Sequence, residues 1–324
     1  MAEIQTPEVP RTWLTFIDAV DRYRLALNDP YAYLDIHGDG IKKRFSGMLN
    51  PYSENTVLIP VFNAKGLPWT LDQFSRQAGK KPDKRIIVFQ NGKAPDSPER
   101  KSVEQAATDL GVEYIPHDKA LGPWGARAYG LYHFNDLFGH FNTAKFIWTY
   151  DEDTGPLFSA YTDSVMSEFD KNNKLGALYS PAIFVTAGGC AELAKLFAYK
   201  TATMSVHAIK SALGKPHTVG STAVFRKEAL FANMHPLWNF VKEGNPDMMK
   251  EDEILKVVVA NGFTAQNTFR PSYWNLTAGD KLVHFGIGPY AKKVLSAQIF
   301  GTNAFANMYK APYVNNNTIP PVNK

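Results

Sequence analysis

Residues 145–153 read KFIWTYDED, an apolar run that ends in the acidic residues Asp151, Glu152 and Asp153. The run has the length and the aromatic composition of a buried strand. Neighbouring carboxylates raise each other's pKa, and burying them without a counter-charge is costly, so a divalent cation would stabilise them. Oxygen ligands suit Mg2+ or Mn2+. The stretch therefore predicts a strand followed by a metal site, although acidic residues also favour the N-terminus of a following helix.

Similar apolar runs lie on both sides of this stretch and alternate with helical patterns. Further strands are predicted at residues 56–62, 85–90, 112–115, 175–180 and 220–226. Helices are predicted from Pro68, between Ser97 and Gly111, and over residues 124–138, 157–172, 227–232 and 246–261. This alternation indicates β-α-β units and an open, mainly parallel α/β sheet flanked by helices.

Polar residues follow several of the predicted strands. Asn63 follows the first strand, Gln90, Asn91 and Gly92 follow the second, and the acidic triplet follows the strand at 145–150. Ligands bind beyond the carboxyl ends of the strands in open α/β sheets. We therefore expect these side chains to meet in one crevice.

Residues 1–54 form a predicted N-terminal extension of the α/β domain. Apolar residues between 12 and 28 fall on one helical face, and Pro30 ends that helix. Residues 31–54 are rich in glycine and aromatic residues and predict an irregular segment. The extension is expected to pack on the main domain through its apolar stripe.

The composition indicates a globular protein with a sizeable core. The chain has 324 residues, 44% of them hydrophobic, and a formal net charge of only +4, which does not by itself imply nucleic-acid binding. Its short basic groups, such as Lys42 to Arg44 and Lys80 to Arg85, predict solvated surface. The single cysteine, Cys190, suits a reducing compartment, and the sequence contains neither a secretory signal pattern nor a long apolar span. A cytoplasmic location without a transmembrane segment is expected.

Short motifs in a fixed order between residues 56 and 263 carry a family resemblance. They are Pro-x-aromatic-Asn at 60–63, a strand with a polar turn at 86–92, GARAYGL at 125–131, FIWTYDED at 146–153, GSTAVFRKEAL at 220–230, and Glu-Asp at 251–252 before a helix that ends in Gly262-Phe263. Each motif alone is weak, but their shared order is specific. The sequence resembles the inverting GT-A glycosyltransferases of family 2.

The resemblance implies a division of the GT-A domain and a set of site residues. Residues 55–180 would form the nucleotide-sugar-binding half, residues 181–290 the acceptor-binding half, and residues 291–324 a C-terminal extension. Asp252 would be the general base. Asp151, Asp153 and His284 would hold Mn2+ or Mg2+, although His284 could equally be a core or surface histidine. The donor site would comprise Pro60, Phe62, Asn63, Asn91, Gly92, Arg127 and Asp151.

The implied activity is metal-dependent, inverting transfer of one hexose or pentose from a nucleoside-diphosphate sugar to an acceptor hydroxyl. A UDP-sugar is the expected donor, yet Gln90 and Asn91 stand where the family usually has an acidic residue that contacts the nucleoside. The Gln-x-x-Arg-Trp signature of processive synthases is not evident after Gly262. A single transfer is therefore expected.

Other functions remain open from the sequence, as does the identity of the acceptor, which could be a glycan, a small molecule or modified DNA. A transferase that glycosylates a hydroxymethylated base in DNA fits the basic groups and the aromatic residues expected at the surface, namely Tyr31, Tyr33, Tyr273, Trp274 and Tyr290. A nucleotidyltransferase also uses paired carboxylates, but the first strand is not followed by a glycine-rich phosphate loop with lysine. An inactive nucleotide-sugar-binding module is the remaining alternative.

Overall fold

The protein is described by a computed structural model. Its described residues are 14–78, 83–133, 143–156, 159–180, 182–184, 191, 194–199, 201, 202, 205, 209, 222–246, 249, 251–267 and 273–275. Within these residues, no helix combines the length and the apolar character needed to cross a bilayer.

Strands and helices alternate through the first half of the chain, as predicted. The helices are α1 (Leu14–Asn28), α2 (Pro30–Phe45), α3 (Leu67–Ser75), α4 (Pro98–Leu110), α5 (Gly122–His133), α6 (Tyr161–Lys171), α8 (Lys227–Phe231), the 3-10 turn η2 (Pro236–Trp238), α9 (Asn239–Lys242) and α10 (Glu251–Ala260). The strands are β1 (Asn55–Val61), β2 (Arg85–Gln90), β3 (Glu113–Ile115), β4 (Phe146–Thr149), β5 (Thr154–Pro156), β6 (Leu175–Ser180), β7 (Ala182–Phe184), β8 (Thr222–Arg226), β9 (Thr264–Asn267) and β10 (Tyr273–Asn275).

The main sheet has seven strands in the order β3-β2-β1-β4-β8-β6-β9. β3, β2, β1 and β4 are parallel neighbours, and β9 is parallel to β6. β8 runs antiparallel to both β4 and β6. A smaller sheet has the order β5-β10-β7. The predicted open α/β sheet is confirmed, with β8 as the reversed strand.

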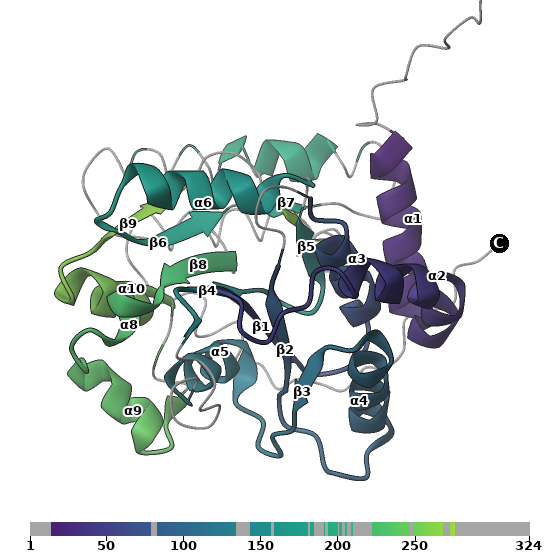
Figure 1. The fold of residues 1–324 in the computed structure, drawn as a ribbon, viewed down its shortest axis with the longest axis horizontal. Helices are drawn as coiled ribbons and strands as arrows, with labels where there is room; N and C mark the ends of the chain where they lie inside the picture. The colour runs from purple at the N-terminus through teal and green to yellow at the C-terminus, as the bar shows by residue number, and fades with distance from the viewer. Residues whose placement is uncertain are drawn as a thin grey trace, which may run out of the picture.

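Helices cover both faces of the main sheet and enclose two hydrophobic cores (Figure 1). Side chains alternate along each strand, so in β1 Val57 and Ile59 enter one core and Leu58 enters the other. The first core is completed by α1, α2, α3, α4 and α6, and the second by α5, α8, α9 and α10. Because both faces are buried, β1, β2 and β6 are buried at every residue.

The N-terminal extension consists of two helices, α1 and α2. The prediction that α1 ends before Pro30 is confirmed, but the expected irregular segment was wrong, because residues 30–45 form α2. Asp29 caps α2 by accepting a hydrogen bond from the Ala32 backbone N–H at 2.9 Å, and Pro30 occupies its first turn. The same proline therefore ends one helix and begins the next.

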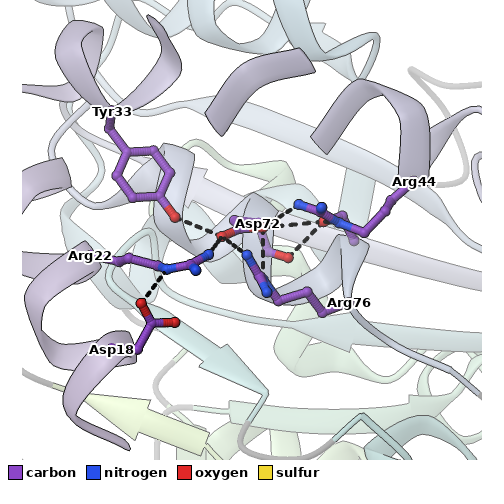
Figure 2. Close-up of polar contacts among 7 residues, drawn as sticks. Asp18, Arg22, Tyr33, Arg44, Asp72 and Arg76 are labelled. Carbon is purple, nitrogen blue, oxygen red and sulfur yellow. Dashed lines mark hydrogen bonds and ion pairs between the residues drawn. The ribbon is translucent and has the colours of Figure 1, made fainter. Parts of the chain in front are cut away.

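A buried carboxylate ties this extension to the α/β domain (Figure 2). Asp72 of α3 accepts hydrogen bonds from the Tyr33 hydroxyl at 2.7 Å and from Arg44 Nη2 at 2.6 Å, both from α2. Arg76, which follows α3 directly, donates to both oxygens of the same carboxylate at 2.9 and 3.0 Å, and Arg22 of α1 lies 3.7 Å away. The cluster thus joins all three helices around one fully buried charge.

Some residues expected at the surface are buried. Tyr33, which was expected at the surface, is 0% exposed in the Asp72 cluster. Lys84 and Arg85 are 0% and 6% exposed, so the prediction of solvated surface was wrong for these two basic residues. Arg85 donates two hydrogen bonds across the sheet to the Glu113 carboxylate, both at 2.8 Å. Lys84 lies over the Trp148 ring, 5.9 Å from its centroid. Basic residues can thus be buried where neighbouring strands supply a carboxylate or an aromatic face.

Candidate active site

The carboxyl ends of β1, β2 and β4 lie at one edge of the sheet. β1 pairs in parallel with β2 on one side and β4 on the other, so Val61 lies opposite Gln90 and Leu58 lies opposite Thr149. Asn63, the 90–92 turn and the acidic triplet follow these ends in the chain. The three polar segments therefore follow strand ends at the same edge of the sheet, and their meeting in one crevice stays a prediction.

The acidic triplet begins a tight loop between β4 and β5. The Thr154 hydroxyl donates to the Asp151 backbone carbonyl at 2.9 Å and accepts from the Asp151 backbone N–H at 3.2 Å. Arg127 of α5 donates through Nη2 to Asp151 Oδ1 at 2.5 Å, and the Arg127 side chain is only 3% exposed. A buried guanidinium therefore supplies a fixed counter-charge to the first carboxylate of the loop.

The backbone of the same loop is held from α1 and α3. The Thr70 hydroxyl donates to the Glu152 carbonyl at 2.8 Å, and the Tyr23 hydroxyl donates to the Asp153 carbonyl at 3.2 Å. Gly66, which precedes α3, has φ +83, and a Cβ atom there would lie 3.0 Å from the Glu152 carbonyl oxygen. Only glycine suits that close, left-handed position. Neither Tyr23 nor Thr70 carries a sequence signal that links it to the acidic motif.

The turn after β2 is shaped by backbone contacts. Asn91 Oδ1 accepts from the Leu121 backbone N–H at 2.9 Å, and Gln90 Nε2 donates to the Val61 carbonyl at 3.2 Å. Gly92 has φ +74, and a Cβ atom there would lie 2.2 Å from Ala120 Cα. This glycine is required by both its conformation and the close approach of the next loop. The turn therefore has one fixed shape beside the β1 end.

The β1 end presents an aromatic ring to solvent. Phe62 is 40% exposed, and the Lys93 ammonium lies 4.1 Å from its ring centroid. Asn63 Oδ1 accepts from the Lys65 backbone N–H at 2.9 Å and thereby fixes the turn into α3, while Pro60 is buried within β1. The contact of Lys93 was not anticipated, although Lys93 directly follows the predicted turn. An exposed ring beside a cation can contact a planar, anionic ligand.

A histidine lies behind the second turn. The His117 backbone carbonyl accepts a hydrogen bond from the Gly92 backbone N–H at 3.1 Å. The His117 and Tyr129 rings pack together with their centroids 4.6 Å apart. Burial lowers the pKa of His117 and raises the pKa of Tyr129. His117 Nδ1 lies 2.9 Å from the Lys119 carbonyl, which favours the neutral tautomer with the proton on Nδ1. Both rings are thus uncharged near pH 7.

The remaining predicted site residues are described only in part. The backbone of Asp252 lies in the first turn of α10, and its side chain is outside the described part of the structure. His284 and Tyr290 lie outside the described residues, as do the side chains of Tyr273 and Trp274. Across the described ranges, no group of three or more His, Cys, Asp or Glu side chains is arranged to hold a metal ion. Asp151 and Asp153 are the predicted ligands that the structure places in one loop.

The family model for glycosyl transferase family 2 matches residues 56–231, which span β1 to α8 and include the acidic loop. The chain belongs to glycosyl transferase family 2. It is a glycosyltransferase with a mixed α/β fold of the GT-A type. Tyr23 lies outside the matched segment of this family 2 protein, whereas Thr70 and Arg127 lie within it.

Solved glycosyltransferases are similar to this family 2 chain at low sequence identity. TarS 1-349 from S. aureus in complex with UDP has 12% identity and a TM-score of 0.44, with 78% of this chain and 67% of that chain covered. The mannosyltransferase PcManGT from Pyrobaculum calidifontis in complex with GDP-Man and Mn2+ has 14% identity and a TM-score of 0.42, with 78% and 65% covered. No curated protein matches the chain.

Proposed function

We propose that this protein transfers one sugar from a nucleoside-diphosphate sugar to an acceptor hydroxyl, with a divalent metal and with inversion at the anomeric carbon. The carrying observation is the acidic loop at the shared edge of β1, β2 and β4, inside the segment that defines the family. The exposed Phe62 ring and the buried Arg127 guanidinium lie on the elements that surround this edge. This arrangement offers an aromatic surface and oxygen ligands at the position where α/β sheets bind nucleotides.

The residues present fit a divalent cation such as Mn2+ or Mg2+. Asp151 and Asp153 offer hard oxygen ligands from one short loop, and these metals complete their coordination with water and substrate phosphates. Asp151 already contacts Arg127, so Asp153 is the proposed main ligand and Asp151 a shared one. A bound metal would offset negative charge on the departing nucleoside diphosphate. His284 remains a proposed third ligand.

Asp252 is the proposed general base. Its carboxylate would accept the proton of the acceptor hydroxyl while the acceptor oxygen forms a bond to the anomeric carbon. The bond between that carbon and the diphosphate oxygen breaks on the opposite face, and the nucleoside diphosphate leaves with the bonding electrons. Inversion follows from this single displacement.

The proposed donor site uses the β1 and β2 ends. Pro60 and Asn63 shape the turn that presents Phe62, and Asn91 and Gly92 shape the facing turn. Because Asn91 Oδ1 is engaged by the Leu121 backbone, its proposed role is to hold the turn rather than to read the base through that oxygen. A UDP-sugar remains the first donor to test. The acceptor stays unassigned, and a cytoplasmic location remains a proposal.

Two variants and a matched control test the proposal. Asp153→Ala should abolish Mn2+-dependent stabilisation by nucleoside diphosphates in thermal unfolding, because a ligand of the native state raises its apparent stability. Asp252→Asn should keep that stabilisation and lower turnover about a hundredfold, as for the loss of a general base. Glu152→Gln, in the same loop, should preserve both properties.

The first measurement is a thermal-shift screen of UDP-, GDP- and other nucleoside-diphosphate sugars with and without Mn2+, followed by product analysis with the donor that binds. Equal activity of Asp153→Ala and the unmodified protein would reject the metal site. Loss of donor binding in Asp252→Asn would instead assign Asp252 a structural role.

A further inference from the structure

We propose that Tyr23 of the N-terminal extension, together with Thr70, positions the acidic loop, so that α1 is a working part of the transferase site. The inference rests on the proposed function of that loop as the metal and diphosphate site. Its basis is that two consecutive backbone carbonyls of the loop, those of Glu152 and Asp153, accept hydrogen bonds from side chains of two different helices.

These hydrogen bonds fix the direction of the loop. A peptide plane has few soft torsions, so a carbonyl that is held in place also restricts the Cα–Cβ direction of the adjoining residues. The Thr70 hydroxyl holds the plane between Glu152 and Asp153, and the Tyr23 hydroxyl holds the plane after Asp153. The Asp153 carboxylate is therefore carried by a backbone that is anchored on both sides.

The two donors are themselves rigidly placed. Tyr23 is 2% exposed and its ring packs edge-on against Trp69, with centroids 4.5 Å apart, while Thr70 is fully buried in the next position of α3. Trp69 also packs against β5, which follows the loop directly, because a Cβ atom on Gly155 would lie 2.9 Å from the Trp69 ring. The loop thus lies against a packed surface formed by α1 and α3.

The Asp72 cluster holds α1 against α3 at this place. Arg22, the neighbour of Tyr23 in the sequence, extends toward the Asp72 carboxylate two positions beyond Thr70 (Figure 2). Tyr33 and Arg44 bring α2 to the same carboxylate. The extension therefore contacts the catalytic domain by a buried ionic cluster and by the Tyr23 hydroxyl bond to the loop.

The location of Tyr23 distinguishes it from the residues common to the family. The family model begins at residue 56, so the part of the chain that supplies Tyr23 is additional to the matched domain. Residues that orient metal ligands from outside the coordination shell change metal affinity or activity by about 10- to 100-fold when they are substituted. An extension that supplies such a residue contributes to function as well as to stability.

The test uses variants that remove one hydroxyl from the full chain. In Tyr23→Phe and Thr70→Val, we expect Mn2+ affinity without donor to fall about tenfold, measured by electron paramagnetic resonance of free Mn2+. Amide hydrogen exchange in residues 151–155 should be faster in both variants without metal. Thr70→Ser retains a hydroxyl and should therefore show the Mn2+ affinity and the amide exchange of the unmodified protein.

Tyr33→Phe is the matched control, because it removes another buried tyrosine hydroxyl of the extension that bonds to Asp72 and not to the loop. It should lower thermal stability and leave both loop measurements unchanged. Unchanged Mn2+ affinity and unchanged exchange in Tyr23→Phe would overturn the inference. If the unmodified protein binds no Mn2+, the metal part of the proposed function fails, and the exchange measurement alone decides the role of Tyr23.

Discussion

Lys84 shows how one residue can oppose the stability of the fold that contains it. Its side chain is fully buried beside β2, with its ammonium over the Trp148 ring. Burial lowers the pKa of Lys84 to about 8, although the nearby carboxylates of Asp83 and Asp163 act in the opposite direction. The folded protein therefore disfavours the charged form that the unfolded chain carries at neutral pH.

Lys84→Met should stabilise the protein at pH 7 by about 3 kcal/mol, because a pKa lowered from 10.5 to about 8 corresponds to a free-energy cost of roughly that size for the charged lysine in the fold. Between these two values the unfolded chain binds more protons at Lys84 than the native state. The unfolding free energy of the lysine form therefore rises with pH, and the advantage of the methionine variant shrinks. Urea unfolding of both proteins at pH 7 and pH 10 measures the difference between their unfolding free energies. A difference that is equal at the two pH values would contradict a lowered pKa of Lys84.

At the scale of single elements, α2 marks the limit of sequence reasoning. Gly38 and Gly40 lower its intrinsic helix propensity, which is why residues 31–54 look irregular. Tyr33, Ile41 and Phe45 nevertheless fall on one helical face and are buried in the first core. The helix is stabilised by tertiary packing and by its Asp29 cap. The intrinsic helix propensities of its residues include neither contribution.

Gly38→Ala should stabilise the protein by about 0.5–1 kcal/mol, because alanine has the higher helix propensity. A Cβ atom at Gly38 would meet no atom within 4 Å, so the packing permits the change. Gly92→Ala is the opposite control, since its positive φ and the nearby Ala120 backbone make a side chain strained. Denaturant unfolding of both variants measures the contrast, and a destabilised Gly38→Ala would show that α2 needs this glycine.

The strands and the acidic loop, unlike α2, were predictable because their sequence patterns are local. The ends of β2 and β6 agree with the predicted strands at 85–90 and 175–180, because strands buried on both faces carry nearly continuous apolar sequence. The reversed direction of β8 was not predictable, since side-chain alternation is the same for either direction. Likewise, the acidic motif is local in the sequence, whereas the Tyr23 contact joins residues 130 positions apart.

At the scale of the whole molecule, one charge joins the extension to the domain. The Asp72 carboxylate is fully buried, and the arginines around it are 25–38% exposed. Burial alone would raise the pKa of Asp72, but hydrogen bonds and charge from Arg76, the Tyr33 hydroxyl and Arg44 together lower it. The extension and the domain should therefore unfold together while this carboxylate is ionised.

Asp72→Asn should destabilise the protein at pH 7 by about 3 kcal/mol, because it leaves the surrounding arginines without their shared buried partner. Because these arginines are partly exposed, the loss of unfolding free energy lies at the lower end of the range for a broken buried pair. Tyr33→Phe removes only one hydrogen bond and should lower the unfolding free energy by about 1 kcal/mol. The pKa of Asp72 is lower in the folded protein than its ordinary value of 3.8. The ionised Asp72 carboxylate therefore stabilises the fold fully above pH 3.8, and this contribution is lost as the pH falls through the pKa of the folded state. The difference between Asp72→Asn and the unmodified protein should therefore narrow as the pH falls below about 4. Urea unfolding between pH 7 and pH 3 measures it; a difference that stays constant would mean that the arginines are held by the shape of the three-helix contact and not by the charge of Asp72.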